Sequence, residues 1–301
     1  MPQAEPILVV GAGAIGSVYA AKLSARHPVT VTGRQDHVDA IRAGGLQLIG
    51  KETMTARVHA VTRVKSIEPN TLVLLTTKVN ASEAALAPMA DLVRDDTVIL
   101  CVQNGLDSEG IARRATGGRG VVLRAITQFG AIFQAPGLIN YTSSGYTLIE
   151  DGSRSAAIAA LLSASGLDGR VSPDIKTEIW RKLIYNCVIN PITAINGTEV
   201  RGIAEPGLDP LKQLVIDECL AVARTQGVRF DVDFLTTIAE VFGAATTIAS
   251  MRQDLMRGRP TEIDHMNGAV ADLGRRAGVD CPVNAALAAI IKSLERCTMT
   301  A

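Results

Sequence analysis

Three polar side chains, Lys182, Asn186 and Asn190, stand at intervals of four residues in an otherwise apolar segment. Residues four apart lie on one face of a helix, one turn above the next. An ammonium group can stabilise negative charge and donate a proton, and amides can bind the oxygen atoms of a ligand. A lysine stem lying along apolar surface, with amides that bond only to backbone, would explain the same residues without chemistry.

The segment that carries this row has a helical pattern over about residues 174–195. Pro191 directly follows Asn190. Because proline lacks an N–H and its ring clashes with the preceding turn, we expect the helix to kink or end there. A bend at this point would aim the Asn190 side chain differently from an ideal helix.

A second group suited to chemistry lies near the N-terminus, where an apolar strand at residues 7–10 precedes a glycine-rich turn and a helical pattern through Leu23. A strand, Gly-x-Gly-x-x-Gly and a helix in this order are the fingerprint of a dinucleotide site. Gly11 makes the tight turn, Gly13 lets a pyrophosphate approach, and Gly16 allows helix and strand to pack. The phosphates would lie at a helix N-terminus, which favours anions. The predicted cofactor contacts are Gly11, Ala12, Gly13, Ala14, Ile15 and Gly16.

The end of the next strand, residues 29–34, indicates which cofactor binds. Proteins that prefer NAD usually carry an acid there for the ribose hydroxyls. This strand ends in Thr32, Gly33 and Arg34, and a guanidinium is a planar donor suited to a phosphate. The prediction is therefore NADP(H). An exposed arginine without a ligand is the alternative, and Asp36, shortly afterwards, argues in the opposite direction.

Two further apolar strands, residues 71–80 and 97–107, finish at Lys78 and at Asn104. In an open parallel sheet, ligands bind beyond the carboxyl ends of the strands. We therefore expect both residues at the same edge as the glycine turn. Residues 121–142 contain Gly and Pro breaks and predict further, antiparallel strands that close the first domain.

From Pro173 onward, helical patterns replace the strands. Pro260 suits the first turn of a helix, and an acid at Glu262 favours the helix dipole, so Glu262 has a structural explanation. Ser250 has one as well, as a helix hydroxyl bonded to its own backbone. The predicted helices span about residues 174–195, 208–228, 231–257, 260–278 and 282–297.

The composition is that of an ordinary globular protein, and 301 residues suffice for two domains. Lys+Arg and Asp+Glu number 30 each, and aromatic residues make up 3%. Neither value favours nucleic acid or an anionic membrane surface as a partner. No stretch approaches the ~20 apolar residues of a membrane span, and "MPQAEP" lacks the basic region of a signal peptide.

The cysteines and histidines do not form a recognisable metal or disulfide pattern. Five cysteines are scattered without a CxxC pair, and four histidines share no ligand spacing. We expect no metal site and a reducing, cytoplasmic setting.

The segments "WRKLIYNCVINPITA" and "SMRQDLMRGRPTEID", supported by "GAGAIG" and "QNG", resemble the ketopantoate reductase (2-dehydropantoate 2-reductase) family over nearly the whole chain. The resemblance implies an α/β N-terminal Rossmann-type domain, residues 1–172, that binds NADPH. An all-α C-terminal domain, residues 173–301, would complete the cleft. The implied reaction reduces the 2-keto group of ketopantoate to give pantoate, a precursor of pantothenate and coenzyme A.

The same resemblance implies a role for each candidate residue. Lys182 would be the catalytic lysine, with Glu262 as its acidic partner near the nicotinamide ribose. The implied substrate-binding residues are Asn104, Lys182, Asn186, Asn190, Asn196 and Ser250. The implied cofactor contacts beyond the glycine turn are Arg34, Lys78, Asn104, Ala131 and Glu262. The chain departs from the family after "NPITAI", where a shorter stretch reads "NGTEVRG", so Asn196 is the least direct match.

Three functions remain open on these residues. The first is an NADPH-dependent ketopantoate reductase acting on a small-molecule 2-keto acid. The second keeps the fold but takes another 2-keto acid, or performs an opine-type condensation. The third is a sensor that binds NADPH without turnover, against which the pair of Lys182 and Glu262 argues. A homodimer is compatible with the resemblance, although the sequence does not give the oligomeric state.

Overall fold

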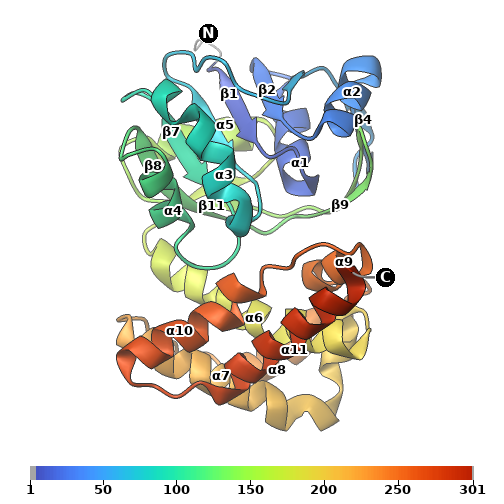
Figure 1. The fold of residues 1–301 in the computed structure, drawn as a ribbon, viewed down its shortest axis with the longest axis vertical. Helices are drawn as coiled ribbons and strands as arrows, with labels where there is room; N and C mark the ends of the chain where they lie inside the picture. Colours follow the sequence, from blue (N-terminus) through green and yellow to red (C-terminus); the bar gives the residue numbers. More distant parts are fainter. Residues whose placement is uncertain (1–4, 300–301) are drawn as a thin grey trace. The chain divides into compact units, whose positions relative to one another are not determined.

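The computed structural model describes residues 5–299, and the contacts of the chain divide it into two compact units (Figure 1). Unit 1 comprises the residues up to Gln103 together with Asp107–Ile175. Unit 2 comprises Asn104–Leu106 together with the residues from Lys176 onward. The predicted fold class, a Rossmann-type α/β region followed by a helical region, is confirmed. The domain boundary between residues 172 and 173 stays a prediction.

An eight-stranded sheet in the order β12-β11-β8-β7-β6-β1-β2-β5 forms the centre of unit 1. Neighbouring strands run parallel except β8 and β11. Every residue of β1, β6 and β7 is buried, as expected for parallel strands covered on both faces. The strands are β1 (Ile7–Val10), β2 (Val29–Thr32), β5 (His59–Val61), β6 (Leu72–Leu75), β7 (Val98–Cys101), β8 (Val121–Thr127), β11 (Thr147–Glu150) and β12 (Gly169–Ser172).

A second sheet, in the order β4-β3-β10-β9, lies against α1 (Ala14–Leu23). Because α1 contacts both sheets, its residues from Gly16 to its end are all buried. The strands of this sheet are β3 (Leu46–Gly50), β4 (Met54–Ala56), β9 (Gly130–Ala135) and β10 (Leu138–Ser143). The remaining helices of unit 1 are α2 (Gln35–Gly44), η1 (Val79–Ala81), α3 (Ser82–Leu86), η2 (Ala87–Leu92), α4 (Ser108–Ala115) and α5 (Ser155–Ala164).

The prediction that residues 121–142 form antiparallel strands is correct for one part and wrong for another. Strands β9 and β10 pair antiparallel. Strand β8, in contrast, runs parallel to β7 and extends the main sheet. The helix α4 between β7 and β8 is the crossover that parallel neighbours require.

Unit 2 is built from helices (Figure 1). Its core includes the buried apolar residues of α6 from Trp180 to Ala194. The helices are α6 (Ile175–Asn196), η3 (Val200–Ala204), η4 (Pro206–Leu208), α7 (Asp209–Thr225), α8 (Phe234–Phe242), α9 (Ser250–Met256), η5 (Ile263–His265), α10 (Asn267–Ala277) and α11 (Pro282–Met299). None of the helices within residues 5–299 is long and apolar enough to cross a membrane.

Two predicted helices differ from the structure. Residues 231–257 form α8 and α9 with an irregular segment between them, since Val200 N–H donates to the Thr247 carbonyl at 2.8 Å and Arg201 N–H to the Ala245 carbonyl at 2.8 Å. The helix predicted from residue 260 begins only at Asn267, so Pro260 does not occupy the first turn of an α-helix.

The helix α6 runs from Ile175 through Pro191 to Asn196, so the predicted range of about 174–195 is confirmed and the helix does not end at the proline. Proline removes the N–H that would bond to the carbonyl four residues earlier. That carbonyl, on Cys187, instead accepts from Asn267 Nδ2 at 2.9 Å. A side chain from another helix thus supplies the missing donor.

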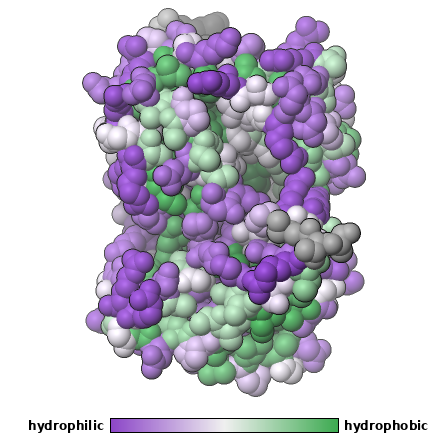
Figure 2. All heavy atoms as spheres, viewed as in Figure 1, coloured by the Kyte–Doolittle hydropathy of each residue, from purple (hydrophilic) through white to green (hydrophobic). Residues whose placement is uncertain are grey.

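Hydrophilic residues cover much of the face drawn in Figure 2, with apolar residues between them. Some large apolar side chains of unit 2 are exposed: Ile195, Leu214, Val232, Val241, Met256 and Ile290.

Candidate functional site

The glycine turn after β1 requires glycine at its first position. Gly11 has φ +101°, and a Cβ there would lie 2.7 Å from both the Cγ2 and the backbone nitrogen of Thr77. The Gly11 N–H donates to Thr32 Oγ1 at 3.1 Å. The turn is therefore tight against the ends of β2 and β6, as predicted.

The other two glycines of the turn have opposite surroundings. A Cβ at Gly16 would overlap the Gly11 carbonyl oxygen and Thr76 Oγ1, so Gly16 permits the close packing of α1 on the strand ends. A Cβ at Gly13 would meet nothing within 4 Å, and Gly13 is exposed at the start of α1. This open space at a helix N-terminus fits the pyrophosphate of a dinucleotide.

The neighbouring strand ends carry the other predicted cofactor residues of unit 1. Arg34 follows β2 as the residue before α2, and Lys78 follows β6 as the residue before η1. Because β2, β1 and β6 are adjacent and parallel, Arg34, Lys78 and the glycine turn lie along one edge of the sheet. Ala131 is half-buried on β9, in the sheet that packs against α1.

The Arg34 side chain is 66% exposed, and its Nε lies 3.8 Å from Asp36 Oδ1. Asp36 is 54% exposed, so this contact is weak and screened by water. Both groups remain accessible to a ligand. The roles of Arg34 and Asp36 in cofactor preference stay predictions.

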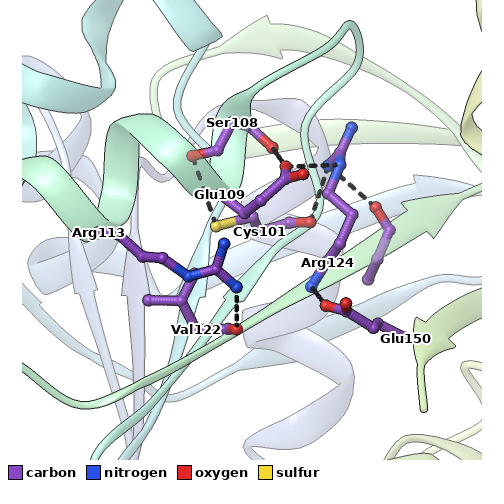
Figure 3. A network of polar contacts seen from close by, with 8 residues as sticks. Cys101, Ser108, Glu109, Arg113, Val122, Arg124 and Glu150 are labelled. Atoms are coloured by element: carbon purple, nitrogen blue, oxygen red, sulfur yellow. Dashed lines mark hydrogen bonds and ion pairs between the residues drawn. The ribbon is translucent and has the colours of Figure 1, made fainter. Parts of the chain in front are cut away.

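Figure 3 shows how unit 1 holds the chain on both sides of residues 104–106. Arg124 on β8 is buried; its Nη1 donates to the Cys101 carbonyl at 2.9 Å, and its Nε lies 3.5 Å from Glu109 Oε2. Directly before residue 104, Gln103 Nε2 donates to Thr77 Oγ1 at 3.3 Å. Burial raises the pKa of the Cys101 thiol to about 12, so this thiol stays protonated and neutral beside the cation.

Residues 104–106 group with unit 2, and Gly105 shows why a glycine follows Asn104. Gly105 has φ +78°, and a Cβ there would lie 2.5 Å from the His265 carbonyl oxygen. The loop therefore packs closely on the segment that begins at Glu262. Within unit 2, the half-buried Asn104 is brought next to this segment.

The polar row on α6 becomes more buried along the helix. Lys182 and Asn186 are half-buried, and Asn190 is 5% exposed. The Asn190 Nδ2 donates to Met266 Sδ at 3.5 Å. Thioether sulfur is a weak acceptor, so this amide can turn to a substrate oxygen at little cost. Glu262 is half-buried, three residues before His265.

The two remaining predicted substrate residues are exposed. Asn196 is the last residue of α6, and Ser250 is the first residue of α9. The backbone bonds from residues 200–201 to residues 245–247 tie the loop after Asn196 to the segment before Ser250. Through these bonds, the shortened loop and the Ser250 segment form one structural element of unit 2.

The sequence did not single out two residues that hold the candidate site. Arg124 and Asn267 are buried and bond to partners 23 and 80 residues away. No local pattern marks such residues, since the tertiary fold sets their partners. Among residues 5–299, no group of three or more His, Cys, Asp or Glu residues could hold a metal ion.

Comparison with known proteins places this architecture in a family. The family model described as ketopantoate reductase PanE/ApbA matches residues 7–154, and its C-terminal counterpart matches residues 174–295. The chain belongs to this family. It is 32% identical over 304 residues to the 2-dehydropantoate 2-reductase of Pyrococcus abyssi, covering 96% of this chain and 97% of that protein. The corresponding protein of Mesorhizobium japonicum is 33% identical over 320 residues, with the same coverage of both chains.

Solved structures agree with this assignment, and one of the similar structures has a different name. The PanE/ApbA family ketopantoate reductase of Ralstonia eutropha superposes with a TM-score of 0.89 at 29% identity, covering 97% of this chain and 99% of that one. A D-mandelate dehydrogenase bound to NADH and anilino(oxo)acetate superposes with a TM-score of 0.88 at 25% identity and the same coverage. The family is one of NAD(P)-dependent 2-keto acid reductases that use a nicotinamide cofactor.

Proposed function

We propose that this protein is a cytoplasmic NADPH-dependent reductase that converts ketopantoate to pantoate, for pantothenate and coenzyme A biosynthesis, with Lys182 as general acid. The observation that carries the proposal is the row of Lys182, Asn186 and Asn190 on one helix of a chain in this family. Buried apolar residues flank the row, including Leu183 and Cys187. Such flanks exclude water and strengthen polar contacts with a substrate.

The chemistry assigned to Lys182 follows from the charge that the reaction creates. When bound, the reduced nicotinamide supplies a hydride to the 2-keto carbon. Negative charge then builds on the carbonyl oxygen, where the Lys182 ammonium stabilises it and donates a proton. The product is a 2-hydroxy acid, and the proton on its new hydroxyl comes from lysine. Glu262 holds the ammonium in place, because lysine is a flexible point charge that needs a partner to be aimed.

The amides serve to orient the substrate. Asn186 and Asn190 lie one and two turns beyond Lys182 and can donate to the carboxylate and the 4-hydroxyl of ketopantoate. Asn104 would meet both substrate and cofactor, and Ser250 and Asn196 would border the far end of the substrate. The Asn190 amide is well suited to this role, since Met266 sulfur competes only weakly for it.

The residues of unit 1 fit NADPH. The open space at Gly13 accommodates the pyrophosphate, and the exposed Arg34 is a donor for the 2′-phosphate. Lys78 and Ala131 would complete the contacts, together with Ala12, Ala14 and Ile15 of the turn. Asp36 is the residue that would favour NAD instead.

A second candidate is the reduction of a different 2-keto acid. The likeness to D-mandelate dehydrogenase over 97% of this chain supports it, as does the short loop after Asn196. A site for an aromatic keto acid would use apolar contacts where a ketopantoate site uses an amide for the 4-hydroxyl. The two candidate functions therefore predict different orders of kcat/KM among 2-keto acids.

The test compares kcat/KM for ketopantoate, 2-ketoisovalerate and phenylglyoxylate with NADPH. Ketopantoate and 2-ketoisovalerate differ by one hydroxyl, and a buried amide left unpaired costs about 1–3 kcal/mol, so kcat/KM should be about five- to a hundred-fold higher for ketopantoate. Equal values for these two acids would contradict the ketopantoate assignment. A preference for phenylglyoxylate would favour the second candidate, and NADPH binding without turnover of any acid would indicate a sensor.

A further inference from the structure

We propose that Asn267 is a positioning residue for the candidate site: its amide replaces the backbone donor that Pro191 lacks, and so fixes the segment from Glu262 to Asn267 against α6. The structural half of this proposal stands on the contacts of unit 2 alone. Its consequence for activity rests on the function proposed above.

The proline leaves one backbone carbonyl of α6 without its usual donor. In an α-helix, the N–H of residue 191 would bond to the carbonyl of residue 187. Pro191 has no N–H, and Cys187 is fully buried, so water cannot replace the lost donor. Asn267 Nδ2 donates to this carbonyl at 2.9 Å. One side chain thereby allows the helix to continue through the proline to Asn196.

A chain of buried amides fixes the orientation of Asn267. Glu218 accepts the backbone N–H groups of Val283 and Asn284 at 2.8 and 2.9 Å, and also accepts Asn284 Nδ2 at 2.8 Å. A carboxylate can only accept, so it turns the Asn284 amide oxygen away from itself. That oxygen accepts from Asn267 Nδ2 at 2.9 Å. Both hydrogens of the Asn267 amide are therefore used, one for Asn284 and one for Cys187.

The anchored segment carries contacts to several candidate site residues. Asn267 directly follows Met266, whose sulfur accepts from Asn190, and His265 lies against Gly105 beside Asn104. Glu262 lies at the start of the same segment. The carbonyl to which Asn267 bonds is that of Cys187, the residue after Asn186. A shift of this anchor would move Glu262 and Met266 relative to the row on α6.

The first experiment measures Asn267→Ala beside Val222→Ala. Val222 is also buried in unit 2, on α7, so its truncation leaves a cavity that destabilises the unit without removing a polar contact of residues 262–267. We expect Asn267→Ala to lower kcat by about ten- to a hundred-fold and to raise KM for the keto acid. The Kd of NADPH should change much less than kcat, because most of the assigned cofactor contacts lie in unit 1. Val222→Ala should lower Tm with kcat and KM of the folded enzyme unchanged.

The second experiment separates positioning from stability by adding Pro191→Ala. Alanine restores the N–H to which Cys187 can bond, so Asn267→Ala should destabilise the Pro191→Ala protein less than the natural one. The missing anchor is not restored, so the kcat loss caused by Asn267→Ala should be the same in both backgrounds.

The proposal would be overturned if Pro191→Ala restored both kcat and stability to the Asn267→Ala protein. It would also be overturned if Asn267→Ala alone folded with unaltered kcat and KM. Equal destabilisation in the two backgrounds would overturn it too, because Asn267 would then not be replacing the proline's donor. If the natural protein reduces no keto acid, the proposed function fails. In that case, the Tm values of the two single variants and the double variant still test whether Asn267 replaces the donor that Pro191 lacks.

Discussion

The two units hold their candidate residues by different physical means. In unit 1, the shape of the glycine turn is set by backbone: Gly11 and Gly16 are required because any Cβ would overlap neighbouring atoms. In unit 2, the central candidate residues are the side chains of Lys182, Asn186 and Asn190 on α6, and distant side chains determine the surroundings of this row. Asn267 reaches Cys187 across 80 positions of the sequence, and Met266 contacts Asn190 across 76.

This difference explains what each kind of site tolerates. A turn defined by steric exclusion fails when atoms are added, whereas a row of side chains fails when single donors are removed. Unit 1 is therefore expected to respond in cofactor affinity and stability, and unit 2 in the rate of the chemical step. The following predictions test that separation.

The largest effect is expected for Lys182→Ala, through kcat. General acid catalysis contributes about 100- to 10,000-fold, and the loss should fall in that range. Lys176→Ala is the matched control, because Lys176 lies on the same helix but is exposed and bonds to the Gln226 carbonyl. Steady-state NADPH oxidation with saturating ketopantoate measures both. A near-normal kcat in Lys182→Ala would make the lysine structural.

The next effect is expected for Arg34→Ala, in unit 1. A charge-assisted bond to the 2′-phosphate is worth about 1.5–3 kcal/mol, so kcat/KM for NADPH should fall about ten- to a hundred-fold while that for NADH barely changes. Arg26→Ala serves as control, since Arg26 precedes β2 and lies at the opposite edge of the sheet. Equal losses with both cofactors would show that Arg34 does not recognise the phosphate.

The contrast between the units also explains how much could be predicted from the sequence. The strands that precede Gly11 and Lys78 follow from local patterns, and the structure has both, although β6 ends at Leu75, three residues before Lys78. The helical pattern predicted that α6 extends past Pro191, but it could not predict which group replaces the donor that the proline lacks, because Asn267 is distant in sequence. The break between α8 and α9 likewise depends on backbone bonds to residues 200–201. Local rules therefore describe unit 1 better than unit 2.

Two glycine variants test the steric account of the turn. Gly16→Ala should destabilise the protein by about 1–3 kcal/mol, as overpacking does, because its Cβ would overlap the Gly11 carbonyl oxygen. Gly13→Ala should cost less than about 1 kcal/mol, since its Cβ meets no protein atom and its φ of −74° suits any residue. It should nevertheless weaken NADPH binding, because the methyl group occupies the space of the pyrophosphate. Urea unfolding measures the stability of both variants, and titration measures their affinity for NADPH. A larger loss of stability in Gly13→Ala than in Gly16→Ala would contradict the steric account.

The smallest effect is expected from His37, which links α2 to the second sheet. Its Nδ1 accepts from Gly137 N–H at 2.9 Å, so the bond requires a neutral ring. Burial lowers the pKa of His37 below 6.5, with a smaller raising effect from Asp36 and a lowering effect from Arg34. The unfolded chain therefore binds the proton first, and stability should decrease as pH falls below about 6.5 until the folded-state pKa is passed.

The measurement for His37 is the urea midpoint between pH 7.5 and pH 5, compared with His37→Gln. The variant should lose this part of the acid dependence, which cannot exceed about 1.4 kcal/mol per pH unit. Identical pH profiles for the two proteins would show that the Gly137 bond does not depend on the charge of His37.

The separation of cofactor binding from chemistry is tested most directly by the affinity of Lys182→Ala for NADPH. Fluorescence titration on the preparation used for kcat gives the Kd, and the natural protein and Arg34→Ala are titrated beside it. We expect Lys182→Ala to bind NADPH with nearly the natural Kd, while Arg34→Ala binds it about ten- to a hundred-fold more weakly. A loss of NADPH affinity in Lys182→Ala large enough to explain its loss of activity would contradict the account.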